Sequence, residues 1–136
     1  MTKDERDLLI KDLCSRLPYG VKVVCLRDFN HEWYNLEMVD IGENEVYVTT
    51  YEPYANRYVE IEAVKPYLFP LSSMTEEQEK ELEEIDPEFY SVIRENGNIC
   101  ISMDVRGYDW LNKNNFDYRG LIPKGLAIDC TCLNIY

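Results

Sequence analysis

Short runs of alternating apolar and polar residues between Gly20 and Phe69 constrain the fold of this chain of 136 residues more than any other feature. The runs 21–26, 46–48 and 59–63 have the period of two that is typical of half-buried β-strands. Residues that favour turns separate them. Four strands with short connections predict a small antiparallel sheet, which either closes into an SH3-like barrel or stays an open meander.

The first residues predict a helix that covers this sheet. Thr2 and Glu5 have the spacing of a capping box, and Pro18 and Gly20 end the helical pattern. An amphipathic helix of this length is marginal alone in water, so it is expected to pack on the sheet. The residues predicted to face the sheet are Ile10, Leu13, Cys14 and Leu17.

Two prolines at positions 66 and 70 predict a stiff connector over 65–70, because proline lacks the N–H that a central strand needs. A second capping box, Thr75 with Gln78, predicts a short acidic surface helix from Glu76 to Ile85. Further on, the pattern predicts a helix restarting at 86–87, a short strand over 99–103, a helix over 104–115, and turns or extended chain to the C-terminus.

The sequence therefore predicts one α+β domain: an N-terminal helix on a small antiparallel sheet, followed by short helices and a C-terminal strand and turn region. Its expected parts are a helix (1–18), the sheet core (20–69), an acidic helical segment (75–96) and a mixed region (99–136). No apolar run is long enough to span a bilayer, and the charged N-terminus does not resemble a secretion signal. We expect a cytoplasmic protein that does not associate with membranes.

The net charge of −12 restricts the partners. A chain this acidic repels nucleic-acid phosphates, so we expect no direct DNA or RNA binding. It can attract a basic protein, or the charge can serve solubility alone. The five cysteines are odd in number, and we expect most to be buried apolar residues rather than disulfide or zinc ligands. No cofactor motif is present, and no cofactor is expected.

Two groups of residues are candidates for binding a protein partner. Aromatic residues gather around one predicted turn of the sheet, where they can form an exposed patch or simply pack between strands. The glutamates of the acidic helix can attract a basic or nucleic-acid-binding protein, or can form a solvated face. The candidates are Trp33, Tyr34, Tyr51, Tyr54 and Tyr58, and Glu76, Glu77, Glu79, Glu81, Glu83 and Glu84.

Catalysis has weaker support from the sequence. His31, the only histidine, is flanked by acids in a predicted turn, but no nucleophile motif accompanies it. A metal-dependent hydrolase would need acids that converge on a magnesium ion. The C-terminal region offers Asp104, Asp109, Asp117 and Asp129. A non-catalytic interaction module is the favoured interpretation, and a small metal-dependent hydrolase is the alternative.

Four stretches also carry a resemblance to a known group of proteins. They are Ile10 to Val21 (IKDLCSRLPYGV), Val64 to Thr75 (VKPYLFPLSSMT), Asp109 to Asn112 (DWLN) and Phe116 to Ile122 (FDYRGLI). The chain resembles a group of small acidic proteins of gut Bacteroidales and of their phages and mobile elements, for which no function is known. The resemblance implies a bacterial or phage origin, a cytoplasmic setting and an accessory role. It implies no activity, cofactor or catalytic residue.

Overall fold

The structure is a computed structural model, and it describes residues 1–27, 33–50, 56–87 and 105–136. In these residues the helices are α1 (Lys3–Arg16), α2 (Glu76–Ile85) and α4 (Val105–Lys113). The strands are β1 (Lys22–Cys25), β2 (Tyr34–Asp40), β3 (Glu45–Thr49), β4 (Arg57–Glu60), β5 (Val64–Pro70), β6 (Phe116–Asp117) and β7 (Ile128–Asp129). Short 3₁₀ helices at Ile61–Ala63 and Leu71–Ser73 flank β5. No helix of the described ranges combines the length and the apolar character needed to cross a bilayer.

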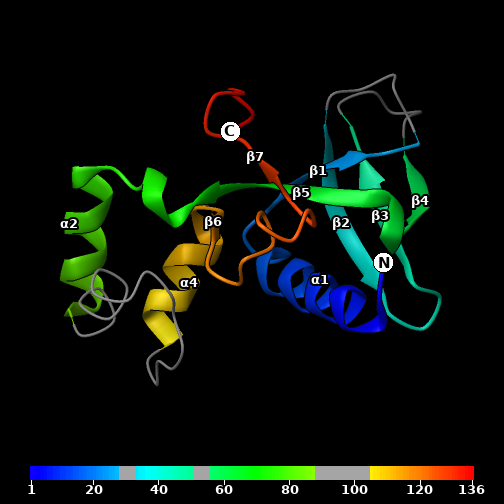
Figure 1. Cartoon of the computed structure of the whole chain (residues 1–136), viewed down its shortest axis with the longest axis horizontal. Helices are drawn as coiled ribbons and strands as arrows, with labels where there is room; N and C mark the ends of the chain where they lie inside the picture. The colour runs from blue at the N-terminus through cyan, green and yellow to red at the C-terminus, as the bar shows by residue number, and fades with distance from the viewer. Residues whose placement is uncertain (28–32, 51–55, 88–104) are drawn as a thin grey trace.

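The strands form one mixed sheet with α1 against it (Figure 1). Their order is β4-β3-β2-β1-β5-β6, and β7 also pairs with β5. The neighbours from β4 to β5 are antiparallel, whereas β6 and β7 run parallel to β5. The described strands leave the sheet open, with β4 at one edge. The predicted α+β class is confirmed, and of the two arrangements that the sequence allowed, the sheet is the open one.

The hairpin of β2 and β3 follows from its local sequence. Asn44 has a positive φ of 54°, a conformation that asparagine tolerates better than most residues, and the Asp40 carboxylate accepts the N–H of Glu43 at 3.1 Å. The strand register shifts between Leu36 and Met38, so Glu37 is the extra residue of a bulge. The side chains of Val46 and Val48 in β3 are fully buried, as the alternating pattern predicts.

The prediction of a connector over 65–70 is wrong, because these residues belong to β5, which lies between β1 and β6. The proline at 66 is tolerated for a geometric reason. The N–H of Leu26 donates to the carbonyl oxygen of Ala63 at 2.7 Å, and bonded pairs alternate along an antiparallel ladder. Pro66 is opposite Val23, in a non-bonded pair, so its missing N–H breaks no bond to β1. Pro70 is the last residue of the strand.

Helix α1 begins with the predicted capping box, in which Glu5 and Thr2 each accept the other's backbone N–H at 3.1 Å. Three of the four residues predicted to face the sheet do pack in the core: Leu13 is fully buried, and Ile10 and Leu17 are partly buried against it. Cys14 is exposed. The side chains that are buried are Leu9, Asp12, Leu13 and Arg16. The apolar spacing did not predict that two of these four are charged, and two ionised groups are buried together only when they pair.

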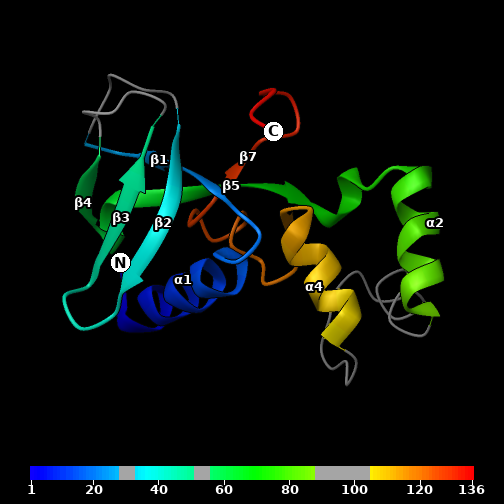
Figure 2. The ribbon, with the colours of Figure 1, turned by 180° about the vertical axis from the view of Figure 1, so that it is seen from behind.

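Two clusters of buried side chains form the interior. The larger one joins Leu9 and Leu13 of α1 to the inner faces of β1, β2, β3 and β5. The smaller one lies at the opposite end of β5, where Leu82 of α2 packs with Trp110 and Leu111 of α4 and with Phe116 of β6. The rings of Trp110 and Phe116 stack with centroids 5.6 Å apart. Helices α2 and α4 are therefore attached through this second cluster, beside the sheet (Figure 2).

The end of the chain folds back on the sheet. The Tyr136 hydroxyl donates to the carbonyl oxygen of Tyr67 in β5 and accepts the N–H of Lys22 in β1, both at 2.9 Å.

Helices α2 and α4 agree with the predictions for 76–85 and 104–115. The predicted helix restart at 86–87 runs into residues that the structure does not describe, and the predicted strand over 99–103 lies wholly outside the described residues.

Candidate functional site

Helix α2 presents the acidic face that the sequence predicts. Thr75 and Gln78 form the expected capping box. The carboxylates of the first turn lie at the positive end of the helix dipole, where negative charge stabilises the helix. Leu82 is fully buried and holds the opposite side of the helix. Five glutamates are exposed and Glu79 is half-buried, and none of the six forms an ion pair with any residue that the structure describes. The exposed ones are Glu76, Glu77, Glu81, Glu83 and Glu84.

The structure describes three of the five aromatic candidates, and they differ in exposure. Tyr34 is fully buried beneath Arg57, whose guanidinium carbon lies 5.8 Å from the ring centroid. It is part of the core, because its position in β2 faces inward. Trp33 is half-buried, with the Lys22 ammonium 4.0 Å from its ring centroid. Tyr58 is 59% exposed on the edge strand β4 and packs against Tyr47, with ring centroids 4.9 Å apart. Tyr51, Tyr54 and His31 lie outside the described residues.

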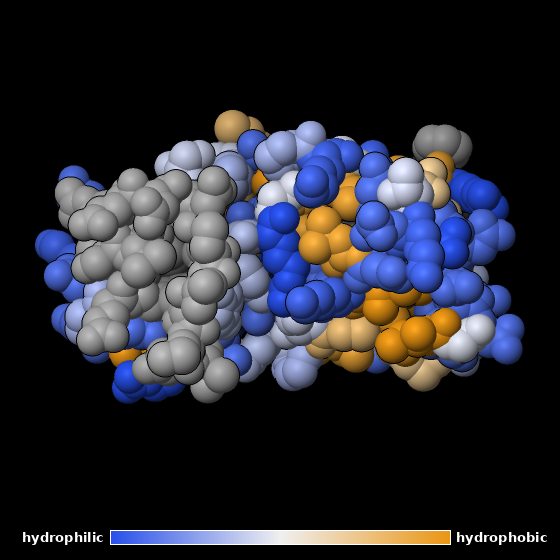
Figure 3. Space-filling view, turned by 60° about the horizontal axis from the view of Figure 1, so that its bottom comes forward, coloured by the Kyte–Doolittle hydropathy of each residue, from blue (hydrophilic) through white to orange (hydrophobic). Residues whose placement is uncertain are grey.

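The described parts of the two predicted binding surfaces lie far apart. Strand β4, with Tyr58, and helix α2, with the glutamates, lie at opposite ends of the molecule in both ribbon views (Figures 1 and 2). A single small partner cannot contact both. Seen from below, hydrophilic residues surround limited apolar patches in the coloured part of the surface (Figure 3). All six glutamates of α2 lie within the described residues, whereas only three of the five aromatic candidates do.

The C-terminal aspartates have structural contacts. Asp117 is buried in β6, and its two carboxylate oxygens accept the N–H groups of Leu121 and Ile122 at 2.9 Å. Hydrogen bonds from Thr131 lower the pKa of Asp129. Asp109 is exposed on α4, and Asp104 lies outside the described residues. Among the described residues, no three Asp, Glu, His or Cys side chains gather closely enough to hold a metal ion.

The described cysteines are split between core and surface: Cys25 and Cys130 are buried, whereas Cys14 and Cys132 are exposed. Burial raises the pKa of Cys130 to about 11, so only about one thiol in a thousand is ionised at pH 8. We expect iodoacetamide to alkylate Cys132 at least about ten times faster than Cys130 in the native protein. Mass spectrometry of the digested protein measures both rates, and unfolding in urea should equalise them. Equal rates in the native protein would contradict the burial of Cys130.

A charged cluster that the sequence did not predict connects α1 to the segment after β6. Arg16 binds Asp12 through two hydrogen bonds, Nε to Oδ2 at 2.8 Å and Nη2 to Oδ1 at 3.0 Å, and both side chains are completely buried. Nη2 of Arg16 also donates to the carbonyl oxygen of Phe116 at 2.7 Å. Arg119 adds a second cation, with Nη1 2.9 Å from Asp12 Oδ1 and Nη2 3.0 Å from the Ser15 hydroxyl.

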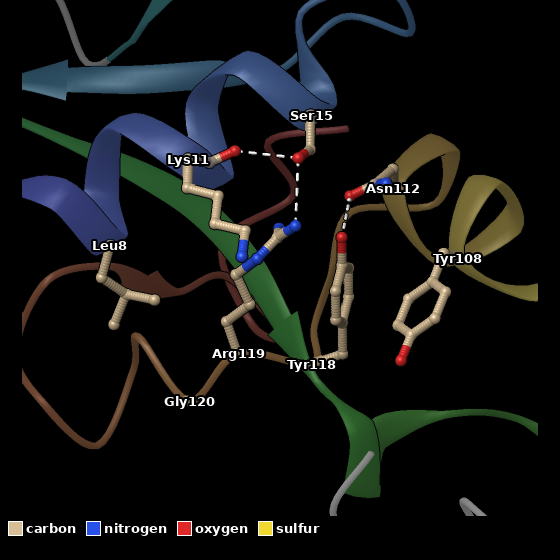
Figure 4. Close-up of a pocket in the computed structure, with 8 residues that line it drawn as sticks. All are labelled: Leu8, Lys11, Ser15, Tyr108, Asn112, Tyr118, Arg119 and Gly120. Atoms are coloured by element: carbon tan, nitrogen blue, oxygen red, sulfur yellow. Dashed lines mark hydrogen bonds between the residues drawn. The ribbon is translucent and has the colours of Figure 1, made fainter. Parts of the chain in front are cut away.

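A pocket of about 620 Å³ lies beside this cluster, between α1, α4 and the segment 118–120 (Figure 4). Its polar and aromatic lining consists of Lys11, Ser15, Tyr108, Asn112, Tyr118 and Arg119. The sequence does not predict this pocket, because its walls are about a hundred residues apart in the chain. One signal was available: an Asp and an Arg four positions apart, on the face of a helix that also carries Leu9 and Leu13.

No protein-family model, no curated protein and no solved structure matches this chain. The assignment of function therefore depends on the contacts and charges of the chain itself.

Proposed function

We propose that this protein is a non-catalytic interaction module whose helix α2 binds a basic protein partner. The observation that carries the proposal is the set of exposed glutamates on α2 that lack a cationic partner among the described residues. Leu82 anchors the helix on its other side, so the acidic face is held in place rather than free to move away. A rigid surface costs less conformational entropy to bind than a mobile one.

The charge pattern of α2 supports this assignment. Glu77 and Glu81, and likewise Glu79 and Glu83, are four positions apart, where like charges on a helix destabilise it by about 0.2 to 0.5 kcal/mol per pair. Lys80 is the only cation in the helix. A partner that supplies lysine and arginine side chains would relieve this repulsion, and the charge of the whole chain would steer such a partner towards it.

The test compares two variants with equal net charge. One replaces the six glutamates of α2 by glutamine. The control replaces six other exposed acids by their amides: Asp4, Asp7, Glu37, Glu43, Glu60 and Asp129. Binding of a synthetic peptide of alternating lysine and arginine is measured by titration calorimetry at about 0.05 and 0.5 M salt.

We expect the α2 variant to bind the peptide at least about tenfold more weakly than the control variant at low salt, because only it lacks the concentrated charge. Wild-type binding should weaken strongly at high salt. Equal weakening of the two variants would show that total charge, and not α2, attracts the peptide, and would contradict the proposal.

A further inference from the structure

The pocket between α1 and α4 differs in charge from the rest of the protein. The chain has 26 acidic and 14 basic residues, yet no carboxylate of the described residues lines this pocket. Two cations do, Lys11 and Arg119. In Figure 4 the Lys11 side chain extends towards the Arg119 guanidinium. Two cations on one wall, with no described acid lining the pocket, repel each other and favour a bound anion.

The charged cluster beside the pocket has more positive charge than is needed to neutralise Asp12. Arg16 alone satisfies Asp12 with two hydrogen bonds. Arg119 then binds the same carboxylate, which leaves the group of Asp12, Arg16 and Arg119 with a net charge of about +1. Lys11 adds a further charge and forms no ion pair with any described residue. The pocket wall therefore has an excess of about two positive charges.

Unused hydrogen-bond donors accompany these charges. A guanidinium has five N–H groups, and within the described ranges Arg119 donates only to Asp12 and Ser15. The Tyr118 hydroxyl donates to Asn112 Oδ1 at 2.8 Å, and the Asn112 amide NH₂ has no partner among the residues that the structure describes. Burial raises the pKa of Tyr118, so this hydroxyl stays protonated and keeps its bond to Asn112 near neutral pH. Lys11 and Arg119 on one side of the pocket, and Asn112 on α4, therefore offer donors to an oxyanion (Figure 4).

The remaining wall is aromatic. The rings of Tyr108 and Tyr118 lie with centroids 5.3 Å apart, and the Arg119 guanidinium carbon lies 4.5 Å from the Tyr118 centroid. Aromatic side chains and stacked guanidinium groups bind planar rings by stacking. The volume of about 620 Å³ is also that of a site for an organic molecule, and it exceeds what a bare phosphate needs.

We propose that this pocket binds a phosphate monoester of a heteroaromatic compound, of the nucleoside monophosphate class. Lys11, Arg119 and Asn112 contact the phosphate, whose charge of nearly −2 at neutral pH matches the excess on the wall. Tyr108 and Tyr118 contact the ring. The site is independent of the acidic face of α2, so the two proposals are tested separately.

The test titrates the full chain with adenosine 5′-monophosphate and, in parallel, with adenosine, inorganic phosphate and benzoate. Lys11 is changed to glutamine and to glutamate, since it is exposed and its loss leaves the fold intact. The same changes at Lys3, exposed at the start of α1 and outside the pocket, are the matched controls. Thermal unfolding checks each variant, and amide chemical shifts of Asn112 and Tyr118 locate the bound ligand.

We expect the monophosphate to bind with a Kd below about 1 mM, and adenosine, phosphate and benzoate each to bind at least about tenfold more weakly. Lys11→Gln should weaken binding about tenfold and Lys11→Glu should abolish it, while both Lys3 variants stay within about twofold of wild type. The proposal is overturned if no monophosphate binds, if adenosine or benzoate binds as tightly, if inorganic phosphate alone accounts for the affinity, or if Lys11→Glu leaves it unchanged.

Discussion

Replacing Asp12 by asparagine should lower the free energy of unfolding by about 3 to 5 kcal/mol. The substitution keeps the size of the side chain but removes the negative charge from a group that Arg16 and Arg119 both contact. The Arg16 side chain is completely buried, and its Nη1 already has no hydrogen-bond partner within the described ranges. A buried guanidinium without a counter-charge is among the most destabilising arrangements in a protein interior.

Urea unfolding followed by circular dichroism measures this loss. Asp7→Asn is the matched control, because Asp7 is an exposed residue of the same helix and the change in charge is identical. Its effect should stay within about 0.5 kcal/mol. Adding Arg16→Met to Asp12→Asn should recover part of the stability, since the unpaired cation is then gone. A loss below about 1 kcal/mol for Asp12→Asn would show that the ion pair is solvated and not buried.

Replacing Leu82 by alanine should cost about 2 to 5 kcal/mol. Leu82 is the fully buried residue of α2, and its side chain packs in one cluster with Trp110, Leu111 and Phe116. Truncation removes these contacts and leaves a cavity that the neighbouring side chains fill only in part. Because α2 is a short helix with repelling glutamates, it should lose its structure before the sheet does.

Hydrogen exchange measured by mass spectrometry tests this order of events. The amides of α2 should lose protection in Leu82→Ala, while those of β1, β2 and β3 should keep it. Glu83→Ala changes the neighbouring exposed residue and should move the free energy of unfolding by no more than about 0.5 kcal/mol. If protection falls equally in α2 and in the sheet, the two clusters of buried residues unfold as one unit, contrary to this expectation.

The features that the sequence predicts well are those built from neighbouring residues. The capping boxes of Thr2 with Glu5 and of Thr75 with Gln78 form as expected, since each needs only residues three positions apart. The first strands and the β2–β3 turn follow from period-two alternation and from residues that accept a positive φ. The acidic face of α2 is also local, because helical periodicity alone decides which side of a short helix Leu82 occupies.

The features that the sequence could not supply depend on partners far along the chain. Pro66 predicts that its segment is not a central strand. Only the register, which places Pro66 opposite Val23 in a non-bonded pair, explains why the strand tolerates the proline. Asp12 and Arg16 interrupt the apolar pattern of α1. Their burial could not be predicted, because the groups that complete their environment, the carbonyl of Phe116 and the guanidinium of Arg119, lie about a hundred residues away.

The sequence by itself thus determined the local elements of this protein: where its first two helices begin, where its first strands run, and that α2 is acidic on one side. Tertiary structure alone decided that the sheet is open with β5 inside it, and that a cationic pocket exists in so acidic a chain. The physical reason is how far apart along the chain the interacting residues lie. Caps, turns and periodicity depend on neighbours within a few residues, whereas buried charge and strand register are stable only when distant segments supply the matching group.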